Sequence, residues 1–437
     1  MRYKPISSQF FTANRRQFTK KLKAGSLAIF HSNDEYPRNG DQNFPFRQQS
    51  DLFYLSGIDQ EDTILMLAPD HPNMALREVL FVKETSEQIA TWEGQKLSKE
   101  EASKASGIKW VQWTKDFEFV LNDLMSWARQ VYLNANEYPK YFNPVPYKDL
   151  RFALELKEQF PSHTFERSAP IMLELRKIKS DTEIALIKKA GDITGKAFNR
   201  VLKALKPGLE EYKIQAEIEY AFAMNGANGS AYKPIIASGA SACVLHYVDN
   251  NKICNDGDLL LMDFGAEYAN YAADITRTIP VNGKFTPRQK ECYEAVLRVH
   301  NKAIQLLVPG TSIDAFNNEV NKLMEQEMIG LKLFSKKDVQ QQDPKKPLFM
   351  KYFMHGTSHP IGLDVHDVGS KYDPLEAGMV LTCEPGLYIR EENCGIRIEN
   401  NILVSKDGPV NLTENIPVTV EEIETLMNRE QGTRNKE

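Results

Sequence analysis

A histidine-rich segment, residues 355–367, lies between two pairs of acidic residues, and this pattern constrains the fold more than any other feature. The segment reads HGTSHPIGLDVHD and holds three of the eight histidines. The first acidic pair lies within residues 259–279 and the second within residues 379–404, in stretches rich in strand-forming side chains. Distant strands must therefore meet at this segment, and the residue types are typical of a metal site.

Each acidic region predicts two strands that carry one carboxylate each. Asp263 and Asp274 form the first pair, and Glu384 and Glu399 form the second. An ionised carboxylate among apolar neighbours is unfavourable unless another charge compensates it. Four carboxylates balance the charge of two divalent cations, and oxygen ligands with one imidazole suit Mn, Fe, Co or Zn. We therefore expect a dinuclear metal centre.

Composition excludes several other classes of protein. The 437 residues are 42% apolar and 26% charged, which is ordinary for a globular chain of two or three domains. A net charge of −5 without a basic patch argues against a nucleic-acid partner. No apolar run is long enough to span a bilayer, and residues 1–10 lack a signal-peptide core, so we expect no membrane partner. Five cysteines without CxxC spacing indicate a cytoplasmic location.

The chain divides into two parts near residue 172. All four tryptophans lie in the first third, whereas every candidate metal ligand lies after residue 245. Strand-like and helical segments alternate in the first part, which predicts an α/β domain. The expected strands are residues 26–32, 62–69, 78–83 and 130–135, and the expected helices are residues 14–22, 117–128 and 149–160.

Residues 173–437 contain a repeated pattern. A capping box that begins at Ser180 starts an amphipathic helix, which ends at Pro207. A second amphipathic helix starts at Thr286 and ends at Pro309. Each is followed by another helical segment and by one acidic region. We expect an α+β domain built from two half-domains with an internal pseudo-two-fold repeat, and a site between the halves.

With these motifs, the chain resembles aminopeptidase P, the Xaa-Pro aminopeptidases of the pita-bread metallopeptidase group. The resemblance includes the capped helix within residues 176–187 and, in the first part, residues 38–57. It implies an aminopeptidase P-type α/β domain over residues 1–172 and a pita-bread catalytic domain over residues 173–437. It also implies two divalent ions, with Mn²⁺ expected ahead of Co²⁺, Fe²⁺ or Zn²⁺, and a homodimer or homotetramer.

The resemblance further implies a role for each site residue. The expected metal ligands are Asp263, Asp274, His359, Glu384 and Glu399. The expected catalytic residues are Glu384, His366 and His355, and the expected substrate contacts are His246, His355, His366 and Tyr388. Arg397 is expected to support a ligating carboxylate, and period-two alternation independently places it on the strand face of Glu399. Trp92 either approaches a neighbouring subunit's site or is an ordinary core aromatic.

The expected activity is removal of the N-terminal residue from peptides with proline in the second position. A hydroxide that bridges the two metals would attack the first peptide bond. Glu384 would carry its proton to the departing proline nitrogen. Two alternatives are a prolidase that cleaves only Xaa-Pro dipeptides and a non-catalytic pita-bread module that binds peptides or proteins. The intact set of acids and histidine argues against the second alternative.

Overall fold

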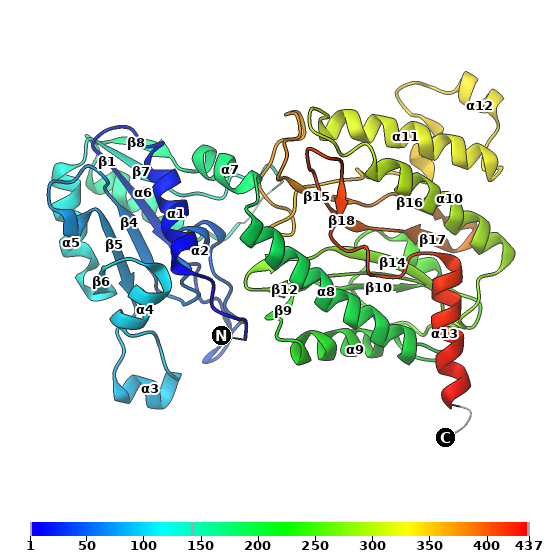
Figure 1. Cartoon of the computed structure of the whole chain (residues 1–437), viewed down its shortest axis with the longest axis horizontal. Helices are drawn as coiled ribbons and strands as arrows, with labels where there is room; N and C mark the ends of the chain where they lie inside the picture. Colours follow the sequence, from blue (N-terminus) through cyan, green and yellow to red (C-terminus); the bar gives the residue numbers. More distant parts are fainter. Residues whose placement is uncertain (1, 141–143, 435–437) are drawn as a thin grey trace. The chain divides into compact units, whose positions relative to one another are not determined.

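The computed structural model describes residues 2–140 and 144–434, and the chain divides into two compact units. The first unit covers residues 3–176, and the second begins at Lys177. The expected boundary at residue 172 lies within helix α7 (Ala169–Lys177), which spans the division (Figure 1). None of the described helices combines the length and the apolar character that a membrane span requires.

The first unit is built on a six-stranded mixed sheet with the order β6-β5-β4-β1-β7-β8. The strands are β1 (Ser26–His31), β4 (Ile64–Leu67), β5 (Glu78–Val82), β6 (Trp110–Trp113), β7 (Gln130–Leu133) and β8 (Thr164–Arg167). The four central strands are those that the sequence predicts. The edge strands β6 and β8 are mostly exposed or half-buried, so their sequences lack the apolar run that marks a central strand.

Helices pack against this sheet. They are α1 (Ser8–Thr19), α2 (Ser50–Ser56), α4 (Lys99–Ser106), α5 (Phe117–Trp127) and α6 (Lys148–Gln159), whereas α3 (Glu87–Glu93) has no buried residue. Apolar residues of α5 and α6 share one buried cluster with strands β1, β4, β5 and β7. Helix α1 begins earlier than the expected residue 14, because the Ser7 side chain caps it by accepting a hydrogen bond from the Gln9 amide. A short hairpin, β2 (Pro37–Asn39) with β3 (Gln42–Asn43), lies apart from the sheet.

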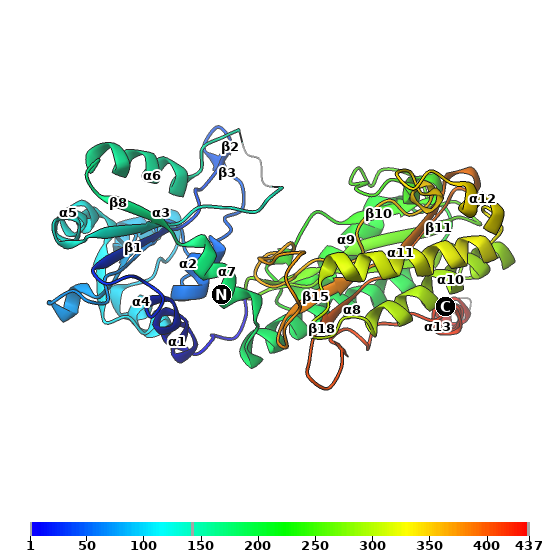
Figure 2. The ribbon, with the colours of Figure 1, turned by 90° about the horizontal axis from the view of Figure 1, so that it is seen from above.

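The second unit contains the two predicted helix pairs. Its helices are α8 (Asp181–Ala204), α9 (Glu211–Met224), α10 (Pro287–Ile304), α11 (Ile313–Gly330), α12 (Lys336–Gln341) and α13 (Val420–Arg434). Capping boxes start α8 at Ser180 and α10 at Thr286, as the sequence predicts. Helix α8 contacts β12 and β13, and α10 contacts β15, β16 and β17. Figure 2 shows the same elements from above.

The strands of the second unit are short and nested. They are β9 (Gly229–Ser230), β10 (Ile235–Ser238), β11 (Leu259–Phe264), β12 (Ala266–Tyr268), β13 (Tyr271–Ala272), β14 (Ile275–Pro280), β15 (Val380–Cys383), β16 (Gly386–Ile389), β17 (Cys394–Arg397), β18 (Asn400–Leu403) and β19 (Val410–Asn411). Strand β11 pairs with β14 around the inner pair β12 and β13. Strand β15 likewise pairs with β18 around the inner pair β16 and β17.

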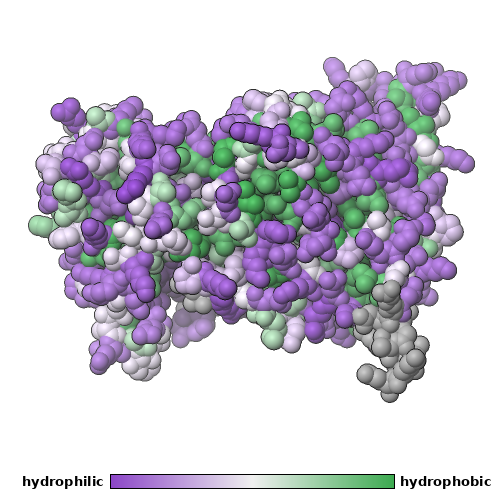
Figure 3. All heavy atoms as spheres, viewed as in Figure 1, coloured by the Kyte–Doolittle hydropathy of each residue, from purple (hydrophilic) through white to green (hydrophobic). Residues whose placement is uncertain are grey.

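The expectation of one carboxylate on each of four strands is therefore only partly right. Asp263 lies in β11, but the other three acids lie where one strand ends and the next begins. These breaks free the acids from strict alternation, so their side chains can turn toward one site. Hydrophilic side chains cover much of the face of the molecule seen in Figure 3.

We predict that Gly265→Ala destabilises the second unit. A Cβ at this turn between β11 and β12 would lie 1.7 Å from the Ala273 carbonyl oxygen. Because the obstacle is backbone, relief requires strand movement, and we expect a loss of about 1–3 kcal/mol in the free energy of unfolding by chemical denaturation.

The matched control for this substitution is Gly330→Ala at the end of α11. Apart from its chain neighbours and the nearby backbone of α11, no heavy atom lies within 4 Å of a Cβ built at that position. We expect Gly330→Ala to be neutral or to stabilise by about 0.5–1 kcal/mol. Equal stability of the two variants would contradict the packing argument.

Candidate metal centre

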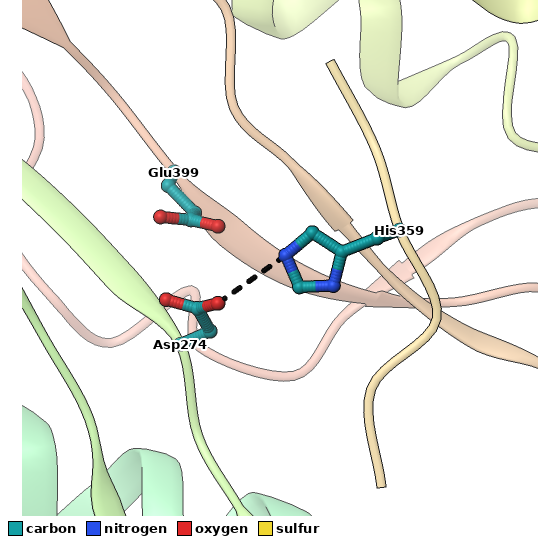
Figure 4. Close-up of side chains that lie close together, drawn as sticks. All are labelled: Asp274, His359 and Glu399. Atoms are coloured by element: carbon teal, nitrogen blue, oxygen red, sulfur yellow. Dashed lines mark ion pairs between the residues drawn. The ribbon is translucent and has the colours of Figure 1, made fainter. Parts of the chain in front are cut away.

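Acids from both strand sets meet at one histidine. Ligand atoms of Asp274, His359 and Glu399 lie within 4.8 Å of one another (Figure 4). The His359 Nε2 atom lies 3.4 Å from Asp274 Oδ2 and 3.8 Å from Glu384 Oε1. These four residues come from the two distant acidic regions and from the histidine-rich segment between them. The fold thus brings together what the sequence separates by more than a hundred positions.

The hydrogen bond on the far side of the His359 ring orients its lone pair. Its Nδ1 atom donates to the Pro360 carbonyl oxygen at 3.0 Å, so a neutral ring directs the Nε2 lone pair at the carboxylates. Two acceptors that face each other repel unless a proton or a cation lies between them. Burial lowers the pKa of His359, but the hydrogen bond to Asp274 and the nearby charge of Glu384 raise it to about 9.

Asp263 joins the site through a tyrosine. The Tyr232 hydroxyl lies 2.6 Å from Asp263 Oδ1 and also contacts Asp274 Oδ1. A hydroxyl carries one hydrogen and can donate to only one of these carboxylates at a time. The carboxylate that does not receive this hydrogen therefore faces an oxygen lone pair, and this contact is favourable only with a proton or a cation between the two oxygens. Burial, followed by the charges of the two aspartates, raises the pKa of Tyr232 well above its ordinary value.

The carboxylates of this site are held where their charge is unfavourable. Burial raises the pKa of Glu399 well above its usual range, and the charges of Asp274 and Glu384 raise it further. Burial also raises the pKa of Asp274, and it raises that of Glu384 to about 7. Oxygen donors with an excess of negative charge and one imidazole nitrogen fit a hard or borderline divalent cation. The residues present therefore suit the metal that the sequence predicts.

Arg397 contacts a different carboxylate from the one that strand alternation predicts. Its Nη2 atom donates to Asp263 Oδ2 at 2.6 Å, and its Nε atom donates to Thr276 Oγ1 at 3.1 Å. Glu399 accepts a hydrogen bond from the same hydroxyl, Thr276 Oγ1, at 2.7 Å. Strand β17 ends at Arg397, before Glu399, so the shared strand face stays a prediction. Arg397 does hold a candidate metal ligand, Asp263.

His355 and Tyr388 continue the same hydrogen-bonded network. Arg397 Nη1 donates to the Tyr388 hydroxyl oxygen at 2.9 Å, and this hydroxyl lies 2.8 Å from His355 Nε2. The other nitrogen, His355 Nδ1, donates to the Gly356 carbonyl oxygen at 2.7 Å. Burial and the charge of Arg397 lower the pKa of His355 to about 4. Tyr388 is fully buried, and both nitrogens of His355 are bonded to protein, so their expected substrate contacts stay predictions.

The remaining two of the four predicted site histidines, His366 and His246, are exposed. The His366 ring centroid lies 4.2 Å from that of His359, so His366 borders the site. His246 follows the short helix η3 (Gly239–Cys243), and its charge contributes to the lowered pKa of His355. In the first unit, Trp92 on α3 is 84% exposed, which contradicts its reading as a core aromatic.

Sequence reasoning missed three residues that hold the carboxylates. Tyr232 bridges the two aspartates, Thr276 binds Glu399, and the Asn401 amide donates to the Asp274 backbone oxygen at 2.7 Å. Thr276 lies only two positions after Asp274, and this closeness in sequence is the one signal that could have marked it. Tyr232 and Asn401 lie far in sequence from their partners, and no local signal marks them.

Comparisons with known proteins agree on one family. Metallopeptidase family M24 matches residues 185–406, and the aminopeptidase P N-terminal domain matches residues 11–132. The chain is 36% identical to an Xaa-Pro aminopeptidase of Escherichia coli strain K12, over 97% of this chain and 98% of that protein. A putative aminopeptidase P from Bacillus anthracis superimposes with a TM-score of 0.90 at 35% identity, covering 97% of this chain and 99% of that one.

A Zn-substituted E. coli aminopeptidase P in complex with product also matches, with a TM-score of 0.88 at 33% identity, covering 98% of this chain and 99% of that one. The chain therefore belongs to metallopeptidase family M24. Within it, the N-terminal domain and the relatives define an Xaa-Pro aminopeptidase, a metal-dependent exopeptidase. The expected enzyme class is confirmed, and the non-catalytic alternative is wrong.

We predict that Tyr232→Phe weakens metal binding by about 10- to 100-fold, because its hydroxyl contacts and orients the carboxylates of Asp263 and Asp274. Competition with a chelator of known affinity measures this change. Tyr220→Phe is the matched control, since Tyr220 is 50% exposed on α9 and distant in sequence from the acids. Unchanged affinity in Tyr232→Phe would contradict the bridging role.

We predict that the metal-free protein loses stability as the pH rises from about 4.5 to 7. Because the pKa of Glu384 is about 7 in the folded state and 4.5 ordinarily, the folded protein binds this proton more tightly than the unfolded chain. The contribution is present below pH 4.5 and is lost through this window, by up to about 3 kcal/mol. Chemical denaturation of Glu384→Gln should show a smaller loss of unfolding free energy over this pH range. The same dependence on pH in both proteins would contradict the raised pKa of Glu384.

Proposed function

We propose that Asp263, Asp274, His359, Glu384 and Glu399 hold two divalent ions, with Mn²⁺ as the native metal. The observation that carries this proposal is the position of His359 Nε2, which lies 3.4 Å from Asp274 Oδ2 and 3.8 Å from Glu384 Oε1, carboxylates of both acidic regions. Four carboxylates and one imidazole match the charge of two such ions. Asp263, Asp274 and Glu399 are each fixed by further hydrogen bonds, which a defined coordination geometry requires.

Divalent ions bound here would supply a nucleophile near neutral pH and would polarise the peptide carbonyl. We propose that Glu384 accepts a proton at its carboxylate and returns it to the departing proline nitrogen. Its Oε1 atom lies 3.8 Å from His359 Nε2, so the carboxylate is within reach of the reaction at this site. His366, exposed beside His359, is proposed to donate a hydrogen bond to the carbonyl oxygen as negative charge develops there.

The substrate is proposed to be a peptide with proline in the second position, with its N-terminal amine beside Asp263 and Asp274. His246 and His355 are proposed to line the path of the peptide, and Tyr388 to set the position of His355 through their hydrogen bond. An exopeptidase that recognises a free amine in this way cleaves only the first peptide bond.

We also propose that the catalytic domain consists of two half-domains related by a pseudo-two-fold repeat, the pita-bread arrangement. Each half has a helix pair followed by an outer strand pair that encloses an inner one. A cytoplasmic location fits five buried cysteines without a disulfide among the described residues. A homodimer or homotetramer would cover the exposed Trp92.

Activity on paired substrates tests this function. Metal-free protein reconstituted with one kind of divalent ion should hydrolyse an Xaa-Pro-Yaa tripeptide and release the first residue. Hydrolysis of the matching Xaa-Pro dipeptide should be much slower. Strict preference for the dipeptide would instead establish a prolidase.

We predict that His359→Ala loses metal and activity together, because Nε2 is a ligand. His366→Ala should retain the metal but lose about 10²- to 10³-fold in kcat, because it removes one donor to the developing charge. Elemental analysis and tripeptide kinetics measure the two effects. Full metal occupancy in His359→Ala would contradict the ligand assignment.

A further inference from the structure

The loop from His359 to Asp367 carries both histidines that border the metal centre, and its first end is fixed by strand β15. The Thr382 amide donates to the His359 carbonyl oxygen at 2.9 Å, and the His359 amide donates to Thr382 Oγ1 at 3.1 Å. Pro360 forms a further bridge to Leu381. His359 is therefore anchored independently of the rest of its loop.

The other end of this loop is fixed by a buried ion pair. Lys179 Nζ lies 2.9 Å from Asp367 Oδ2, and each side chain is only 1% exposed. Asp367 directly follows His366, and its amide donates to the Pro360 carbonyl oxygen at 3.0 Å, which closes the loop on itself. Lys179 is held in turn, because it directly precedes the capped start of α8 and its amide donates to the Gly378 carbonyl oxygen at 2.8 Å.

Gly362, inside the loop, packs against this ion pair and leaves no room for a side chain. A Cβ at Gly362 would lie 2.2 Å from Asp367 Oδ2 and 3.0 Å from Lys179 Cε. The Gly362 carbonyl oxygen also accepts a hydrogen bond from the Ala272 amide at 2.8 Å, close in sequence to Asp274. The loop backbone therefore packs directly on the pair, and the pair sets where the loop runs.

Stability alone does not explain such a pair. Two buried charges lose their hydration, and well-packed apolar side chains of similar volume often stabilise a fold equally well. What a buried pair supplies that apolar side chains do not is a single, directional position for the backbone that carries it. Here that backbone carries His366.

We propose that Lys179 and Asp367 are positioning residues that hold His366 in place to meet the substrate carbonyl. This inference rests on the proposed role of His366. Because His359 is anchored separately, loss of the pair should displace His366 while the metal stays bound. We therefore expect kcat to fall while KM and metal content change little.

The test combines substitutions of the pair with His366→Ala. Lys179→Met and the double variant with Asp367→Leu remove the pair, and the double variant leaves no unpaired buried charge if Lys179→Met fails to fold. The matched control is Lys177→Met, since Lys177 forms a more exposed ion pair with Glu376 just two residues earlier. Metal content, circular dichroism and tripeptide kinetics are measured for each.

We expect at least a tenfold loss of kcat on removal of the pair, unchanged metal content, and no change in Lys177→Met. Added to His366→Ala, removal of the pair should cause little further loss, because both changes act through one side chain. Unchanged kcat, parallel loss of metal, or a full additional tenfold loss in the His366→Ala background would each overturn the inference. Full activity of His366→Ala itself would overturn the proposed role of His366, a result that this series separates from the others.

Discussion

The structure of the second unit depends on the charge of four carboxylates at one site, three of which lie around the imidazole of His359. Burial raises the pKa of Asp274, Glu384 and Glu399, so their ionised forms are unfavourable without added positive charge. Arg397 supplies one positive charge, to Asp263. The remaining negative charge makes the site a receptor for divalent cations, and the metallopeptidase family to which the chain belongs uses that property for hydrolysis.

Nested strand pairs bring these carboxylates together. An outer pair closes around an inner pair in each half, and an acid lies at a break between strands rather than in a regular ladder. Hydrogen bonds then fix the acids individually. Thr276 holds Glu399, and Tyr232 joins Asp263 to Asp274. These partners are uncharged, so they orient the carboxylates without neutralising the charge that the metal ions require.

Local sequence signals and residue spacing predicted helix starts and candidate ligands better than they predicted which side chains contact one another. The start of α8 at Ser180 was predictable because a capping box is read within four residues. Asp263 could be recognised as a candidate ligand because an acid in an apolar strand is unusual. Tyr232 could not, since its partners lie more than thirty positions away and a lone tyrosine carries no pattern. The contact of Arg397 with Asp263 could not be predicted either, because the two residues lie 134 positions apart in the sequence.

We infer that five residues, Asp263, Asp274, His359, Glu384 and Glu399, form one dinuclear centre. The most direct measurement is anomalous X-ray diffraction at the metal edge from crystals of the Mn²⁺-loaded protein. We expect two anomalous peaks, both within coordination distance of these carboxylates and one of them beside His359 Nε2. A single peak, or a metal that His359 does not contact, would contradict it.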